Sequence, residues 1–286
     1  MVRKLIQISA GLLQNSYLNG FFTGRLYRGK LKSFCVPGLN CYSCPGALGA
    51  CPIGSMQALS TNPKLTVSLY VYGFIVFIGV LTGRFVCGFL CPFGLVQELL
   101  FKIPLVKFRE RKVFRMLNKL KYAVLIVLVI GIPTVLTLGG GVGFPAFCQW
   151  LCPAGTLEAG IPLVLFNSHI RDAAGVLFVW KAAVLLLLIL VSTKLFRPFC
   201  RFLCPLGAFY SLFNRISVIH IHTDKKTCKG CNECLCCCPM SAGGTDSTEC
   251  IRCGKCVKNC PDKAMSWRGV RKNTESSATV GYSKAE

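Results

Sequence analysis

The sequence predicts a mainly α-helical membrane protein: a polytopic helical bundle of about four spans, internally duplicated, with a small α+β domain at the C-terminal end. Three observations predict this class. Hydrophobic residues make up 53% of the 286 residues, which is too apolar for an ordinary soluble domain. One cysteine-containing motif occurs twice, each time after a long apolar run. Residues 217–286 lack such runs and hold half of the twenty cysteines.

Three apolar runs are long enough to cross a bilayer. Residues 65–83 and 122–141 carry no charge, and residues 173–196 carry only Lys181 and Lys194. Each run is close to the ~20 residues that a hydrocarbon core of ~30 Å requires. We therefore predict a membrane-spanning helix in each of the three.

Residues 5–22 are the fourth candidate span. They contain four amide side chains at helical spacing, which would form one polar stripe: Gln7, Gln14, Asn15 and Asn19. Such a helix lies in the membrane interface, or crosses with its stripe turned toward the other helices. We expect it to cross, so that residues 1–216 form a membrane domain.

The charges of the loops predict the orientation. The loop 84–121 is rich in Lys and Arg, whereas Arg171 is the only Lys or Arg in the loop 142–172. Because positively charged loops stay in the cytoplasm, we expect a multi-pass protein of the inner membrane with its C-terminal domain in the cytoplasm. The cations between Arg25 and Lys32 would then lie outside, which runs against the same rule.

Two regular runs of cysteine mark the C-terminal domain, which we place at residues 217–268, beginning with a short alternating strand (SVIHIHT) and followed by a disordered tail at 269–286. The runs are Cys228-x2-Cys231-x2-Cys234-x3-Cys238-Pro and Cys250-x2-Cys253-x2-Cys256-x3-Cys260-Pro. This spacing is typical of bacterial ferredoxins with two [4Fe–4S] clusters, in which the fourth cysteine of each run binds the other cluster. We expect one cluster on Cys228, Cys231, Cys234 and Cys260, and the other on Cys250, Cys253, Cys256 and Cys238. A zinc site is the alternative, and Cys236 and Cys237 fall outside the pattern.

The repeated motif lies in the membrane part. Residues 84–94 read RFVCGFLCPFG and residues 197–207 read RPFCRFLCPLG, which align without a gap, so the chain looks duplicated. Each copy supplies two cysteines, and four thiolates are the complement of one [4Fe–4S] cluster. We expect the copies to share a third cluster on Cys87, Cys91, Cys200 and Cys204. Since Pro is favoured at the first position of a helix, we expect Cys91 and Cys204 at helix N-caps, where the helix dipole favours a negative cluster.

Six further cysteines flank the predicted spans on the outer side: Cys35, Cys41, Cys44, Cys51, Cys148 and Cys152. The sequence Cys-Pro-x-Gly begins at Cys51 and Cys152, as it does at Cys91 and Cys204. An additional iron–sulfur centre near the outer face would use Cys148, Cys152 and Cys51, with Cys44 or Cys41 as the fourth ligand. The remaining cysteines are available for a further site. Disulfides are the alternative, because the outside is oxidising.

A residue able to hydrogen-bond stands six positions after the cysteine of each Cys-Pro-x-Gly unit: Gln57, Gln97, Glu158 and Tyr210. These side chains would lie about two turns into the helices that we predict there. They either face a quinone or a proton path, or they are interfacial polar residues.

The formal net charge is +22, from 33 Lys and Arg against 11 Asp and Glu. A [4Fe–4S] centre with four thiolates carries about −2 or −3, so part of this excess compensates the clusters. A nucleic-acid partner is the other interpretation of so basic a chain. The apolar composition argues against it, and we expect no nucleic acid.

These residues resemble a known group, the NapH-, MauN- and NosR-type family of membrane-bound ferredoxins with Cys-x3-Cys-Pro motifs. The resemblance covers the second to fourth predicted spans, both copies of the repeated motif and the two C-terminal runs. It implies electron transfer between the quinone pool or a cytoplasmic donor and redox enzymes on the outer side. The six outer cysteines depart from the simpler NapH-like pattern and suggest additional centres.

We therefore expect an integral membrane iron–sulfur electron-transfer protein that relays electrons to a redox partner at the membrane or its outer face. It would be a subunit of a larger redox complex rather than a self-contained enzyme, because no acid–base pair or nucleotide loop is visible. The alternative is an accessory or maturation reductase for a partner metalloenzyme. The distance between cysteines on the two faces of the membrane is a difficulty for electron transfer, since a helix over residues 65–83 is ~28 Å long. One electron hop does not cover that span unless a quinone or a partner's cofactor bridges it or the Cys-Pro segments re-enter the bilayer.

Overall fold

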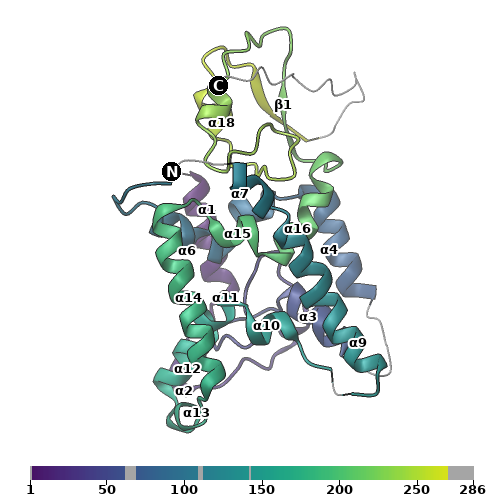
Figure 1. Ribbon diagram of the computed structural model, residues 1–286, viewed down its shortest axis with the longest axis vertical. Helices are drawn as coiled ribbons and strands as arrows, with labels where there is room; N and C mark the ends of the chain where they lie inside the picture. Colours follow the sequence, from purple (N-terminus) through teal and green to yellow (C-terminus); the bar gives the residue numbers. More distant parts are fainter. Residues whose placement is uncertain (1, 62–68, 109–111, 142, 270–286) are drawn as a thin grey trace.

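The computed structural model describes residues 2–61, 69–108, 112–141 and 143–269, and the chain is mainly helical, as predicted. The helices form an elongated bundle with the small C-terminal domain on one end (Figure 1). The N-terminal end of α1 (Val2–Gln14) lies near that junction, whereas α2 (Asn19–Thr23) and α13 (Ser168–Asp172) lie at the opposite end. Apart from Gly269, the tail that we expected to be disordered falls outside the described residues.

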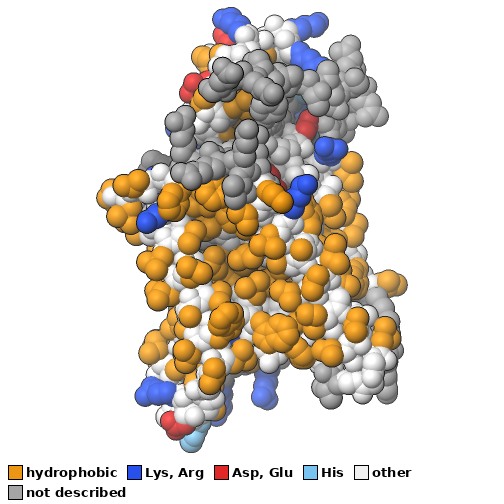
Figure 2. Space-filling model, in the orientation of Figure 1, with side chains coloured by type: hydrophobic (Ala, Val, Ile, Leu, Met, Phe, Trp, Pro, Cys, Tyr) orange, Lys and Arg blue, Asp and Glu red, His pale blue; other side chains and the backbone are white. Residues whose placement is uncertain are grey.

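Two of the described helices are long and apolar enough to cross a membrane, by length and composition. One runs from Leu120 to Leu138 as α8 (Leu120–Ala123), the π-helical η2 (Val124–Gly131) and α9 (Ile132–Leu138). The other is α14 (Val176–Lys194). Apolar side chains cover the bundle between its charged ends (Figure 2). Such an apolar surface suits lipid rather than water.

The described π-helical segments each precede a proline. Pro133 follows η2, and Pro162 follows η3 (Thr156–Gly160) at the start of α12 (Ile161–Phe166). Proline lacks the N–H that would close the next α-helical turn. The missing bond allows the wider π turn to form in the residues before it.

The remaining apolar helices are shorter than a membrane core requires. They are α4 (Leu69–Thr82), the continuous helix Pro153–Phe166, and α1, whose 13 residues extend about 20 Å. A bundle of four spans is therefore not confirmed, and residues 65–68 of the predicted second span lie outside the described residues. The polar stripe of α1 faces the bundle, because Gln7 Nε2 donates to the carbonyl oxygen of Cys91 at 2.9 Å.

Four short helices begin at the proline of a Cys-Pro pair: α3 (Pro52–Ser60), α6 (Pro92–Leu100), α11 (Pro153–Gly155) and α16 (Pro205–Leu212). The preceding cysteine is the N-cap in each case, which confirms the prediction for Cys91 and Cys204. Short helices stand before three of them: α5 (Phe85–Phe89), α10 (Ala146–Trp150) and α15 (Pro198–Phe202). The other connecting helices are η1 (Lys30–Ser33), α7 (Lys112–Leu117) and η4 (Phe213–Arg215).

The C-terminal domain is built on one antiparallel pair of strands. The predicted strand is β1 (His220–Thr223), and it pairs with β2 (Met265–Arg268) with Ile221 opposite Trp267. Between them lie two short helices, α17 (Glu233–Cys236) and α18 (Lys255–Asn259). Ile221 is buried and Trp267 packs edge-on against Phe85 of the bundle.

Buried charges hold the C-terminal domain on the bundle. The guanidinium of Arg84 and the ammonium of Lys121 are fully buried, and both pair with the carboxylate of Glu249. The two parts also touch through their backbones, because a Cβ on Gly88 would lie 2.4 Å from the carbonyl oxygen of Ile251. The close approach requires glycine at position 88.

Candidate functional site

Four cysteines of the repeated motif lie together, and we call them the proximal set: Cys87, Cys91, Cys200 and Cys204. Cys87 lies on α5 and Cys200 on α15, while Cys91 and Cys204 cap α6 and α16. All four are buried, with 5% to 7% of each side chain exposed. The Cys204 thiol interacts electrostatically with the other three. The structure therefore brings together the cysteines that the repeat predicted to share a site.

A second group of four, which we call the distal set, forms farther from the C-terminal domain: Cys41, Cys51, Cys148 and Cys152. The Cys152 thiol interacts with the other three thiols. The two remaining cysteines of the predicted outer group have other neighbours, since Cys44 Sγ lies 3.6 Å from Asn15 Oδ1 and Cys35 Sγ lies 3.9 Å from Ser55 Oγ. Of the two candidates for a fourth ligand, the geometry favours Cys41.

The arginine at the start of each copy of the repeated motif hydrogen-bonds to the backbone of the other copy. Arg84 donates to the carbonyl oxygen of Cys200 at 3.0 Å, and Arg197 donates to that of Cys87. Both guanidinium groups are fully buried, and each also pairs with a carboxylate, at 3.0 and 2.8 Å. The exchange gives the proximal set an approximate two-fold arrangement, and the buried carboxylates offset the cost of burying the cations.

The glycines of the Cys-Pro-x-Gly units face the cysteine sulfurs. Each donates its backbone N–H to the thiol of its own cysteine: Gly54, Gly94, Gly155 and Gly207. A Cβ on Gly155 would lie 3.5 Å from Cys41 Sγ and 3.7 Å from Cys152 Sγ. The amides at each helix start favour a negative group beside these sulfurs.

Groups of four buried cysteine sulfurs are the kind of ligand set that a [4Fe–4S] cluster uses. All twenty cysteines are free thiols in the structure. Among the described residues, no three His, Cys, Asp or Glu side chains converge closely enough to hold one metal ion. A zinc ion requires four sulfurs within about 2.3 Å of a single point. A cluster binds each thiolate at a different iron, so its ligands stand farther apart.

Seven of the eight cysteines in the two C-terminal runs interact in the groups that the ferredoxin spacing predicts. No such interaction assigns Cys260 to either group. Cys234 interacts with Cys228 and Cys231, which are exposed, whereas Cys250 interacts with Cys253 and with Cys238 from the other run. We call Cys228, Cys231, Cys234 and Cys260 the first C-terminal set. We call Cys238, Cys250, Cys253 and Cys256 the second C-terminal set. Burial raises the pKa of Cys250 to about 11 and that of Cys256 to about 12.

One loop connects the two membrane sets. The backbone N–H of Leu39 bonds to the Cys91 thiol, and that of the next residue, Asn40, bonds to the Cys51 thiol. Consecutive amide nitrogens are less than about 4 Å apart, so the Cys51 and Cys91 sulfurs are separated by no more than about 12 Å. This is much less than the ~28 Å expected from a full-length helix between them. The Cys-Pro segments that carry the two membrane sets therefore lie close together.

The residues at the sixth position after each Cys-Pro-x-Gly cysteine turn toward the cysteine sets. Gln97 Nε2 lies 3.2 Å from Cys200 Sγ, and Gln57 Nε2 lies 3.1 Å from Cys148 Sγ. Glu158 accepts the N–H of Cys41 at 2.7 Å, and the hydroxyl of Tyr210 donates to Pro37 in the connecting loop. Spacing identified these four positions, but it did not predict that they act on the cysteines.

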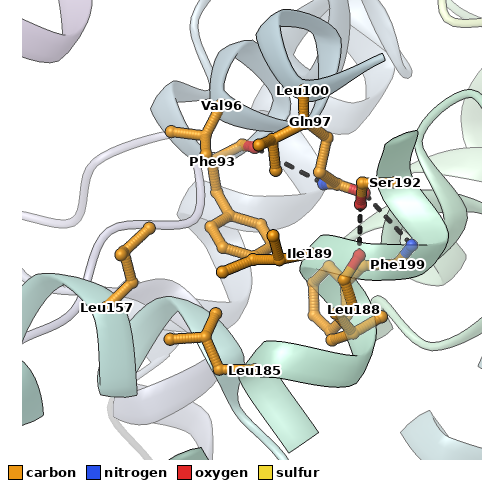
Figure 3. A pocket seen from close by; sticks show the side chains of 10 residues that line it. All are labelled: Phe93, Val96, Gln97, Leu100, Leu157, Leu185, Leu188, Ile189, Ser192 and Phe199. Atoms are coloured by element: carbon orange, nitrogen blue, oxygen red, sulfur yellow. Dashed lines mark hydrogen bonds between the residues drawn. The ribbon is translucent and has the colours of Figure 1, made fainter. Parts of the chain in front are cut away.

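A small cavity lies beside Gln97, between α6 and α14 (Figure 3). Its volume is about 90 Å³, and its walls are almost entirely apolar, including Phe93, Leu188 and Phe199. The amide of Gln97 is already engaged with Phe199 and Cys200, and Ser192 donates to Leu188. The two polar side chains that line the cavity, Gln97 and Ser192, are thus both hydrogen-bonded within the protein.

Comparison with known proteins agrees with this geometry. A family model described as a 4Fe-4S binding domain matches residues 65–113, 122–162 and 176–223, and a second model with the same description matches residues 245–266. An uncharacterised protein of Methanocaldococcus jannaschii is 32% identical over 202 residues, which cover 68% of this chain and 75% of the relative. Ferredoxin-type proteins named MauN and NapH also match. The chain belongs to the NapH- and MauN-type family of ferredoxin-type proteins. The resemblance to these two groups that the motifs indicated is thereby confirmed.

Two relatives show how far the NapH/MauN similarity extends. The methylamine utilization ferredoxin-type protein MauN of Methylobacillus flagellatus is 27% identical, over 66% of this chain and 60% of its own length. The ferredoxin-type protein NapH of Haemophilus influenzae is 25% identical, over 58% of this chain and 50% of its own. No solved structure matches the chain. As a NapH/MauN-type protein, the chain is an iron–sulfur protein of the electron-transfer class, and its two long apolar helices suggest a membrane location.

Proposed function

We propose that the protein is an integral membrane electron-transfer protein that holds four [4Fe–4S] clusters, one on each cysteine set. The observation that carries the proposal is the closeness of neighbouring sets. Leu39 and Asn40 link the proximal set to the distal set. On the other side, Gly88, next to Cys87, contacts Ile251, next to Cys250 of the second C-terminal set. The four sets would thus form one continuous path from the exposed end of the C-terminal domain to the interior of the bundle.

Iron–sulfur clusters, when bound, take up and release single electrons. The residues of this chain prepare the sites for such a charge change. Burial keeps water from the membrane sets, and the helix-start amides and the crossed arginines stabilise negative charge close to them. Seven of the eight cysteines of the membrane sets lie on or cap short helices, and Cys41 lies in a loop. Little rearrangement would therefore accompany each electron.

The apolar surface and the charged loops indicate how the protein lies in the membrane. We place residues 1–216 in the membrane, with the apolar surface of α14 and of the α8–α9 helix against lipid. Residues 217–268 form the ferredoxin domain, which the positive loop beside it puts in the cytoplasm. Electrons would pass between a cytoplasmic donor or the quinone pool and a redox partner at the membrane or its outer face, within a larger complex.

A turnover assay tests this proposal. Purified protein in proteoliposomes is given reduced ferredoxin or a quinol on one side and an electron acceptor on the other, and transfer is followed over many cycles. We expect sustained transfer from the intact chain and its loss in Cys91→Ser and Cys152→Ser. Cys236→Ser is the matched control, because that cysteine is exposed and lies outside all four sets. Reduction without repeated turnover would instead support an accessory reductase.

A further inference from the structure

Gln57 and Gln97 occupy equivalent positions at the two membrane sets. Each stands six residues after the cysteine that begins its helix, on α3 and α6 respectively. Each reaches the first cysteine of the opposite Cys-x3-Cys-Pro motif, with N···S distances of 3.1 Å to Cys148 and 3.2 Å to Cys200. The first half of the repeat therefore places the same amide on the same kind of sulfur twice, once at each membrane set.

The orientation of both amides is fixed by a second hydrogen bond. The backbone N–H of Phe199 donates to Gln97 Oε1 at 3.1 Å, and the N–H of Phe147 donates to Gln57 Oε1 at 2.9 Å. A backbone N–H needs an acceptor, and only the oxygen of an amide can accept. The nitrogen of each glutamine is therefore the atom that faces the sulfur (Figure 3 shows the bond from Phe199 to Gln97).

The surroundings make these two bonds strong. Gln57 is fully buried and Gln97 is 2% exposed, so no water competes for either amide. Hydrogen bonds to charged acceptors are roughly twice as strong as those between neutral groups. A donor that faces a cluster ligand therefore binds the more negative, reduced form more tightly than the oxidised form, and so it favours reduction.

The other two positions of the repeat do not supply such a donor. Glu158 presents an acceptor to the backbone of Cys41, and the hydroxyl proton of Tyr210 goes to the carbonyl of Pro37. Within the part of the chain that the structure describes, each membrane set thus receives one side-chain amide N–H on sulfur, and both come from the first half of the repeat.

We propose that Gln57 and Gln97 are matched positioning residues that raise the reduction potentials of the distal and proximal clusters by donating to Cys148 and Cys200. This rests on the proposed function, because it requires a cluster on each membrane set. The one-electron reduction of each cluster adds one negative charge next to the amide N–H. Removing either amide destabilises that reduced state at its own site and leaves the other site unchanged.

Redox titration followed by low-temperature EPR tests the proposal on the full-length, cluster-loaded protein. Gln97→Met and Gln57→Met remove the donor at nearly constant volume, and the cavity beside Gln97 leaves room for the new side chain. We expect about a tenfold lower reduced fraction of one membrane cluster at a fixed ambient potential, which is a downward shift of about 59 mV for a one-electron couple. The two variants shift different signals, so each serves as the control for the other.

Further variants distinguish the loss of the hydrogen-bond donor from a change in side-chain packing. Gln97→Glu and Gln57→Glu keep the acceptor for the backbone N–H but lose the donor, and we expect an equal or larger downward shift. Gln7→Met removes a buried amide that ends on the carbonyl oxygen of Cys91 instead of a sulfur, and we expect a clearly smaller shift.

Unchanged potentials at unchanged iron content would overturn the proposal. Loss of the membrane cluster from both the Met and the Glu variants would also overturn it, because the glutamines would then be structural supports. Wild-type protein without EPR signals beyond those of the C-terminal domain would refute the proposed function instead.

Discussion

The carboxylate of Glu249 joins the C-terminal domain to the bundle, and replacing it should loosen that junction. Its side chain is 12% exposed, and its partners Arg84 and Lys121 are fully buried. Glu249→Gln leaves two buried cations without their carboxylate. Breaking a buried pair in this way costs about 3–5 kcal/mol, and the slight exposure of Glu249 places the expected cost near the lower limit, about 3 kcal/mol.

Amide hydrogen exchange measures this loss directly. The amides of Val218 and Ile219 bond to the carbonyl oxygens of Val80 and Leu81 at 3.0 Å, so they exchange only when the junction opens. A cost of about 3 kcal/mol raises the population of the open state about a hundredfold, and exchange at both amides should quicken by about that factor.

The control variant is Asp262→Asn, which breaks a pair in the same domain between Asp262 and the exposed Lys229. Surface pairs contribute about 0–1 kcal/mol, so exchange at Val218 and Ile219 should change by less than about fivefold. Equal exchange rates in the two variants would refute the conclusion that Glu249 anchors the domain.

Three further predictions concern the cysteine sets. Cys41→Ser should remove about four irons per chain, whereas Cys44→Ser should remove none. If iron analysis shows the reverse, Cys44 rather than Cys41 is the fourth ligand of the distal set. Gly155→Ala should retain full iron at the distal set, because the new Cβ would lie at ordinary van der Waals distance, 3.5 Å, from Cys41 Sγ; a loss of about four irons would show that the helix start leaves no room for a side chain beside a bound cluster. Gly88→Ala should separate the C-terminal domain from the proximal set, because its Cβ would lie 2.4 Å from a backbone oxygen. Slower electron transfer from the second C-terminal set, measured by rapid mixing, would confirm the contact, and an unchanged rate would contradict it.

The sequence predicted the site best where a motif repeats. The two copies at residues 84–94 and 197–207 share every residue that positions a cysteine: the arginine, both cysteines, the proline and the glycine. Because equal local sequences form equal helix starts, the proximal set followed from the alignment. The same reasoning indicated Cys51, Cys148 and Cys152 at the distal set.

The fourth cysteine of the distal set was not predictable from spacing. Cys41 stands ten positions before Cys51, whereas Cys87 stands only four before Cys91. The intervening loop follows an irregular path, and long-range contacts such as that between Glu158 and Cys41 determine it. No local pattern in the sequence records contacts of this kind.

The short distance between the proximal and distal sets could not be predicted from the sequence either. Hydropathy predicts where helices lie but not how deep the segments between them reach. The short distance depends on the amides of Leu39 and Asn40, in a loop that has no periodic pattern. Likewise the polar residues Gln57 and Gln97 were recognised by position, while their direction toward sulfur depends on how the two halves pack.

Iron and acid-labile sulfide per chain, measured on purified full-length protein, test the central claim most directly. Four occupied cysteine sets predict about sixteen irons and sixteen sulfides for each chain, with Mössbauer spectra of [4Fe–4S] clusters only. About eight irons would mean that the C-terminal domain alone carries clusters, and that the buried cysteines of the bundle do not form the electron path.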